Sequence, residues 1–234
     1  MVSERLAEVR ERLAAAAARA GRSPADVVLV AVSKTRTPDE IRAAVAAGQL
    51  DFGENYAHEL AAKRAALADL PQVRWHMIGH LQRNKAKLLV PGIHRLQTVD
   101  SPRLVEALDR RLAESDARLD VMVQVDVAGE EQKSGAPPAE VPGLLAAVRT
   151  APRLRLRGLM VIPPFTADAE ESRPYFRALR ELAVRLGLRG EEGELSMGMS
   201  DTYEAAVEEG ATLVRVGTAI FGDRPAPARG PAGQ

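Results

Sequence analysis

The chain of 234 residues has no cysteine, few aromatic residues and no excess of charge of either sign. The absence of cysteine excludes disulfides, thiolate nucleophiles and cysteine-based metal sites. Lys plus Arg and Asp plus Glu both number 32, so no basic excess is present to grip the phosphates of a nucleic acid. Aromatic residues make up only 3% of the chain, which leaves no stacking surface for single strands.

Long hydrophobic runs are missing too. No stretch approaches the ~18 uninterrupted apolar residues of a membrane-spanning helix. Glu4, Glu8 and Glu11 interrupt the N-terminal region, which therefore lacks the apolar core of a signal peptide. We expect a cytoplasmic protein that does not bind a membrane.

The chain does contain a regular alternation of short apolar runs and helical patterns. An amphipathic helix is expected over Ser3–Ala20, and the apolar run Val27–Val32 predicts a strand buried on both faces. Thr37-Pro38-Asp39-Glu40 is a capping box that begins the next helix, which Gly48 ends. The further strand candidates are Leu50–Gly53, Val73–Ile78, Arg95–Val99, Val121–Val127, Leu156–Ile162, Glu194–Met197 and Leu213–Val216. The helices expected between them are Glu54–Ala68, Leu81–Leu88, Pro102–Glu114, Ala139–Thr150, Asp168–Leu186 and Thr202–Glu209.

This alternation predicts an α/β fold with a parallel sheet, either a closed (β/α)₈ barrel or an open doubly wound sheet. Eight strands within about 200 residues favour the TIM-like barrel, with the N-terminal helix as an addition. No linker or change of composition precedes residue 222, so we predict one barrel domain over residues 1–223. Residues 224–234 are rich in Pro, Gly and Ala and are expected to form a disordered tail.

The candidate site residues follow the predicted strands 1, 7 and 8, whose C-terminal ends form the active face of such a barrel. Lys34 comes directly after the first strand, where a solvated surface lysine is the alternative interpretation. A small-residue turn, Leu195–Asp201, and the pair Gly217-Thr218 offer free backbone N–H groups for a phosphate. Arg215 lies within an apolar strand and must either pair with a carboxylate or face a ligand.

A lysine, two phosphate loops and an arginine able to face a ring nitrogen describe a pocket for pyridoxal 5′-phosphate (PLP). The four histidines do not form ligand-spaced pairs with acidic neighbours, and the spacing His76-x-x-x-His80 spans a strand end, so no metal site is expected. The basic stretch Arg83–Lys87 is interpreted as a solvated helix face. No paired-carboxylate or Ser/His/Asp motif indicates a catalytic residue.

Several segments resemble the pyridoxal-phosphate homeostasis protein family, and they run in order from about residue 3 to 223. They are Ala31–Thr35, Phe52–Tyr56, Trp75–Lys85, Gly158–Met160, Leu195–Asp201 and Arg215–Gly222. The resemblance implies a fold-type III PLP barrel, similar to the N-terminal domain of alanine racemase. It implies a Schiff base on Lys34, Asn55 close to the cofactor, Arg215 at the pyridine nitrogen, and a phosphate held by the turn of Ser196, Met199 and Ser200 together with Gly217 and Thr218.

Two positions depart from the family pattern. Asp126 stands where the family commonly has Asn, which leaves the role of the Gly129–Gly135 loop open. Met77 stands where Phe is common. Neither position belongs to the lysine or the phosphate turns.

The resemblance implies a protein of intracellular PLP homeostasis that carries or supplies PLP, with no established turnover. A weak PLP-dependent amino-acid racemase is the alternative. A racemase also needs a second proton-transfer group opposite the lysine. Alanine racemase has a further β domain, and its opposing subunit supplies a tyrosine, whereas this chain ends shortly after the eighth strand. The expected partners are PLP and, as recipients, PLP-dependent apo-enzymes, and the expected state is a monomer.

Overall fold

The eight strands form a closed parallel barrel in the order β1 to β8, in a computed structural model that describes residues 1–129, 134–166 and 168–223. This confirms the barrel and excludes the open sheet. The predicted disordered tail, 224–234, lies outside the described residues. The strands are β1 Val28–Val32, β2 Asp51–Glu54, β3 Arg74–Met77, β4 Arg95–Val99, β5 Leu119–Gln124, β6 Leu154–Met160, β7 Glu194–Ser196 and β8 Leu213–Val216.

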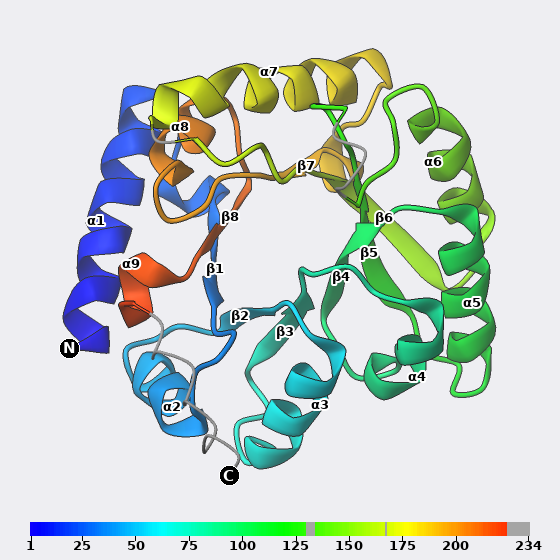
Figure 1. The fold of residues 1–234 in the computed structure, drawn as a ribbon, viewed down its shortest axis with the longest axis horizontal. Coiled ribbons are helices and arrows are strands. Elements are labelled where there is room, and N and C mark those ends of the chain that lie inside the picture. Colours follow the sequence, from blue (N-terminus) through cyan, green and yellow to red (C-terminus); the bar gives the residue numbers. More distant parts are fainter. Residues whose placement is uncertain (130–133, 167, 224–234) are drawn as a thin grey trace, which may run out of the picture.

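Helices surround the barrel, and α1 is the predicted additional helix (Figure 1). It packs beside α8 and α9, with Leu6, Val9, Leu13, Ala16 and Ala17 on its buried face. The α-helices are α1 Val2–Arg19, α2 Pro38–Ala46, α3 Ala57–Ala66, α4 Ala86–Leu89, α5 Pro102–Ala113, α6 Val141–Thr150, α7 Ala169–Arg185, α8 Tyr203–Glu208 and α9 Thr218–Phe221. Short 3-10 turns cover η1 Pro24–Asp26, η2 Arg83–Lys85 and η3 Gly190–Glu192.

Most differences from the predicted elements lie at their ends. The predicted helix Leu81–Leu88 is a 3-10 turn followed by the short α4, and Pro91 prevents its continuation. Strands β5 and β6 begin two residues earlier than predicted because Leu119 pairs with Leu154 at the start of their ladder. The predicted helix over Glu54–Ala68 begins only at Ala57, because Glu54 still belongs to β2.

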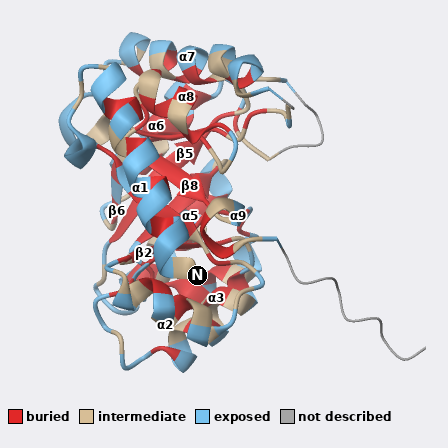
Figure 2. Ribbon diagram, turned by 90° about the vertical axis from the view of Figure 1, so that its left-hand side faces the viewer, coloured by how far each residue is buried: buried red, intermediate tan, exposed pale blue. Residues whose placement is uncertain are grey.

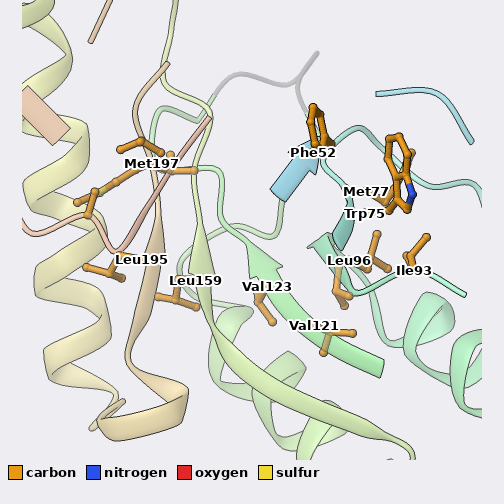
Figure 3. Close-up of a cluster of buried hydrophobic side chains, with 14 of the residues drawn as sticks. Phe52, Trp75, Met77, Ile93, Leu96, Val121, Val123, Leu159, Leu195 and Met197 are labelled. Carbon is orange, nitrogen blue, oxygen red and sulfur yellow. The ribbon is translucent and has the colours of Figure 1, made fainter. Parts of the chain in front are cut away.

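The core has two parts, which follow from the two-residue alternation of the strands. The larger part lies between the barrel and its helices, and Figure 3 shows some of its side chains, among them Phe52, Leu96 and Val121. Figure 2 shows buried strands inside a shell whose outer helix faces are exposed. A separate small cluster of Val30, Met122, Met160 and Leu213 occupies the opposite faces of its strands. On β8 that face also carries Arg215, so the barrel interior contains polar as well as apolar side chains.

Among the described residues no helix is long and apolar enough to cross a membrane.

Candidate functional site at the C-terminal mouth of the barrel

Lys34 lies in a tight turn directly after β1. The turn is closed by a hydrogen bond of 3.0 Å from the Arg36 N–H to the Ser33 carbonyl. Thr35 has a φ of +66°, an unusual value for a β-branched residue. The segment that carries the lysine is therefore held in a conformation that the chain would not choose locally.

A buried cluster of charges holds this turn in place. The Lys63 ammonium donates to the Ser33 carbonyl at 2.5 Å and to carboxylate oxygens of Glu54 and Glu59, each at 2.7 Å. Glu59 also accepts from the Thr35 N–H at 2.6 Å, so contacts of Lys63 and Glu59 fix the backbone on both sides of Lys34. Burial raises the pKa of Glu54, against the opposing effect of its hydrogen bonds from Lys63 and Ser33. This cluster was not predicted from the sequence, although Glu59 and Lys63 have the i,i+4 spacing of a helical ion pair.

Asn55 follows β2 at the same end of the barrel. Its Oδ1 is buried and has no hydrogen-bond partner. A Cβ on Gly79 would lie only 2.1 Å from the Asn55 carbonyl oxygen, so the approach of the segment after β3 requires glycine there. This close contact fixes where Asn55 lies relative to the mouth.

The turn after β7 and the end of β8 meet through one hydroxyl. The Ser200 Oγ accepts from the backbone N–H groups of Gly217 at 3.1 Å and Ala219 at 3.5 Å. Gly198 has a φ of +91°, and a Cβ there would lie 2.5 Å from that of Ala206. Glycine therefore allows the turn to fold closely onto α8, which brings the two predicted half-sites together.

A cavity of about 310 Å³ opens at this mouth, within the usual size range of small-molecule sites of ~300–1,000 Å³. Seven of the eight predicted site residues line it: Lys34, Asn55, Met199, Ser200, Arg215, Gly217 and Thr218. The cavity is also lined by Asp201, at the end of the predicted phosphate turn, and by four residues that were not predicted: Val32, Ile78, Ile162 and Phe165. These residues lie at or after the C-terminal ends of strands, where such a barrel carries its site. Inspection of the C-terminal end of every predicted strand would have indicated them.

Ser196 is the predicted site residue that lies elsewhere. It is the last residue of β7 and is fully buried, and its Oγ accepts from Arg215 at 2.6 Å and donates to Gln97 at 2.6 Å. Both bonds turn the hydroxyl into the barrel rather than toward the turn that was expected to hold a phosphate. The resemblance placed Ser196 correctly in the chain, but alternation along the strand decides where its side chain points.

Arg215 is 4% exposed and also donates to the Val161 carbonyl at 2.8 Å. None of the described carboxylates pairs with it, so the expected alternative of a salt bridge is not found within that part of the chain. Burial lowers the pKa of Arg215 to about 10, which leaves the guanidinium charged at neutral pH.

The structure shows the surroundings of both residues that depart from the family pattern. Asp126 Oδ1 accepts from the backbone N–H groups of Ala128 at 3.2 Å and Gly129 at 3.0 Å. This is a local turn that needs only an acceptor oxygen, which an Asn amide would also supply. The rest of that loop, 130–133, lies outside the described residues. Met77 is buried in the core outside the barrel.

The structure corrects the expectation that the histidines have no acidic partners. At the C-terminal ends of β3 and β4, His80 Nδ1 lies 3.0 Å from Asp100 Oδ2. At the opposite, N-terminal mouth, His76 Nε2 lies 3.0 Å from Asp51 Oδ1. Asp51, His76 and His94 offer ligand atoms that all lie within 4.8 Å of one another. These residues come from neighbouring strands and are distant in the sequence, so spacing along the chain could not reveal the cluster.

Charges and burial set the protonation of this cluster. Burial opposes ionisation of Asp51, but hydrogen bonds from Arg74 and His76 outweigh it and hold the pKa of Asp51 well below its usual range. Burial lowers the pKa of His76, and burial and neighbouring cations lower the pKa of His94 to about 4. At neutral pH the cluster therefore combines a carboxylate with two neutral imidazoles.

Comparison with known proteins finds relatives that match nearly the whole chain. Residues 5–225 match the family described as the N-terminal domain of alanine racemase. The pyridoxal phosphate homeostasis protein of Pseudomonas aeruginosa is 46% identical, with 95% of this chain and 96% of that protein covered. The human protein of the same name is 41% identical, with 94% and 85% covered. The structure of PipY from Synechococcus elongatus with PLP bound has a TM-score of 0.83 at 39% identity, with 95% and 100% covered.

The fold and matched segment first place the chain in the class of alanine-racemase-like barrels. An alanine racemase from Corynebacterium glutamicum, 22% identical with a TM-score of 0.64, shares this fold. The chain belongs, within this class, to the family of pyridoxal phosphate homeostasis proteins.

Proposed function

We propose that this protein binds PLP at the C-terminal mouth of its barrel and acts in intracellular PLP homeostasis, holding the cofactor through a Schiff base on Lys34. The observation that carries the proposal is the buried Arg215 guanidinium, which lines the same cavity as Lys34 and has no carboxylate partner among the described residues. The relatives named for PLP homeostasis and the PLP-bound PipY structure support it.

The residues present fit the cofactor. A buried cation without a carboxylate is costly unless a polar ligand faces it, and the unpartnered Asn55 Oδ1 adds a second unsatisfied polar atom nearby. When bound, PLP supplies an aldehyde that reacts reversibly with an amine, and a pyridine ring conjugated to it. Lys34 would supply the amine and Arg215 would face the ring nitrogen. Because arginine only donates hydrogen bonds, it favours an unprotonated nitrogen there.

The phosphate would lie at the facing turns of Met199-Ser200 and Gly217-Thr218. The Ser200 hydroxyl already joins these turns, so they form one surface before any ligand is present. Phe165 on the cavity wall is 88% exposed, which places the site at the protein surface. Such a site suits a protein that releases its cofactor as well as holding it.

Racemase activity is not favoured as the alternative. No tyrosine is found among the described residues that line the cavity. Tyr203 is buried beside Arg12, and Tyr56 is 61% exposed at the start of α3. A second proton-transfer group opposite Lys34 is thus not supplied by these tyrosines.

The proposal also covers the domain, the location, the oligomeric state and the recipients of the cofactor. Residues 1–223 make up a single PLP-binding domain, the protein is a cytoplasmic monomer, and PLP-dependent apo-enzymes receive the cofactor from it. Recipients can be tested by following recovery of an apo-enzyme's activity after the PLP-loaded protein is added. If contact is needed, the transfer rate rises with the concentration of apo-enzyme and exceeds the rate of free PLP release.

The central experiment is to add PLP, record the visible absorbance, reduce with borohydride and map the labelled peptide. We expect one label, on Lys34, and none in a Lys34→Ala variant that keeps wild-type unfolding behaviour, because this side chain lies at the mouth. Lys87→Ala, an exposed lysine on α4, is the matched control and should label like wild type. Labels scattered over surface lysines would refute the assignment. Incubation with D- and L-amino acids tests the racemase alternative in the same samples.

A further inference from the structure

A continuous chain of hydrogen-bonded side chains crosses the barrel interior from β8 to β2. The Arg215 guanidinium donates to Ser196 Oγ at 2.6 Å, and Ser196 donates to Gln97 Oε1 at 2.6 Å. Gln97 Nε2 lies 3.0 Å from His76 Nδ1, and His76 Nε2 lies 3.0 Å from Asp51 Oδ1. None of the five residues is more than 6% exposed. The chain therefore connects the C-terminal mouth with the N-terminal mouth without reaching water in between.

The Asp51 end of this chain fixes the direction of its bonds once His76 is neutral, as the lowered pKa of His76 implies. An ionised carboxylate can only accept, so a neutral His76 carries its proton on Nε2 and its Nδ1 accepts from the Gln97 amide. The Gln97 oxygen then faces Ser196, which donates to it and accepts from Arg215. With a neutral His76, only this arrangement satisfies all the links.

The chain also fixes the orientation of Arg215. Ser196, Gln97 and His76 each turn an acceptor toward the cation and a donor toward Asp51, which polarises the bonds in one sense and strengthens them. The guanidinium is therefore held from the barrel interior by Ser196 and by the Val161 carbonyl, without a direct ion pair.

A divalent cation held by Asp51, His76 and His94 is the competing explanation of the cluster at the N-terminal mouth. Arg74 donates to both oxygens of Asp51, at 2.7 and 2.5 Å, and the His76 proton points at the same carboxylate. A metal would have to displace these donors and reverse the proton on His76. The contacts favour the end of a hydrogen-bond chain over a metal site.

We propose that Asp51, His76 and Gln97 are positioning residues, which hold Ser196 and through it keep Arg215 oriented toward the cofactor cavity. This inference rests on the proposed function, because its consequence is the retention of PLP. Asp51, His76 and Gln97 do not themselves line the cofactor cavity. The proposal gives these polar residues of the barrel interior an indirect role at that cavity.

The direction of the chain can be tested without PLP, by measuring the ¹⁵N shifts of the histidine side chains. His76 should be the neutral Nε2–H tautomer at neutral pH. Either the Nδ1–H tautomer or a cationic His76 would overturn the proposal. If added Zn²⁺ shifts the His76 and His94 signals together at 1:1 stoichiometry, the cluster is a metal site and the proposal is overturned.

The effect on the cofactor is tested with Gln97→Leu, which removes both bonds in the middle of the chain. The matched control is Thr98→Val, which deletes the neighbouring buried bond from Thr98 to the Gly79 carbonyl at 2.8 Å and leaves the chain intact. We expect Gln97→Leu to release PLP about tenfold faster and to shift the visible absorbance of the bound cofactor, the effect of loosening one hydrogen bond to a charged group. Thr98→Val should keep the wild-type spectrum and release rate.

If Gln97→Leu does not fold, Gln97→Glu takes its place. It keeps an acceptor for Ser196, so the release rate should stay near that of wild type, while His76 should become protonated on both nitrogens between two carboxylates. Equal release rates for Gln97→Leu and Thr98→Val would refute the positioning role. Failure of wild type to label Lys34 would instead refute the proposed function, so the two failures are distinguishable.

Discussion

At the scale of single residues, the site depends on side chains that hold the lysine turn as much as on Lys34 itself. Lys63 is the clearest case, because its side chain is 7% exposed and its ammonium contacts Glu54, Glu59 and the Ser33 carbonyl. Glu54 is fully buried, and its Oε2 has no partner. Removal of Lys63 would leave that charge uncompensated.

Lys63→Met is therefore expected to lower the free energy of unfolding of the PLP-free protein by about 3–5 kcal/mol, the usual cost of breaking a buried ion pair from one side. Urea denaturation measures it. The double variant Glu54→Gln/Lys63→Met should recover a part of the loss, because no buried charge then remains in that pair. A single variant within about 0.5 kcal/mol of wild type would show that the pair does not stabilise the turn.

At the scale of elements, local signals predicted the starts of α2 and α5 correctly. The predicted capping box of α2 is confirmed, since Thr37 Oγ1 accepts from the Glu40 N–H and Glu40 accepts from the Thr37 N–H. Ser101 occupies the same position at α5, also before a proline, but makes no such side-chain bond. The two helices thus form a natural pair for comparison.

Thr37→Ala should destabilise the protein by about 1 kcal/mol, because one backbone N–H at the start of α2 loses its acceptor. Ser101→Ala is the control and should change the unfolding free energy much less. Thermal or urea unfolding of both variants measures the difference. Equal losses of unfolding free energy would show that the Thr37 side-chain hydrogen bond adds no stability to the start of α2.

At the scale of the whole molecule, the histidines at the N-terminal mouth of the barrel make the stability depend on pH. His76 and His94 have lowered pKa values in the folded protein, about 4 for His94, whereas a free imidazole titrates near ~6.5. Between these values the unfolded chain binds more protons than the folded one, so stability falls as pH falls. Asp51 adds to this below about pH 4, because its depressed pKa gives stability that is lost on further acidification.

Urea unfolding at a series of pH values from 7 to 4 should therefore show a continuous loss of stability. His94→Gln should reduce the slope of that loss, since one of the two imidazoles is gone. A stability that is flat between pH 6.5 and 4.5 would contradict the lowered pKa values.

The sequence by itself determined the barrel and its order of elements, and seven of the eight site residues predicted from it meet in one cavity. It could do so because alternation of buried strands with capped helices is a local property, and because parallel strands bring their C-terminal ends to one mouth. The motifs at Lys34, Ser200 and Arg215 needed only that rule to be placed together.

Only the tertiary structure decided the inward turn of Ser196, the cluster of Lys63 with Glu54, and the chain from Arg215 to Asp51. Each joins residues from different strands or helices whose spacing along the chain carries no signal. Whether a strand residue points into the barrel or toward the helices depends on the register and closure of the strands. A shift of one residue reverses this direction, and the sequence pattern does not determine the register that closely. Burial then decides which polar groups must find partners, and those partners come from across the barrel.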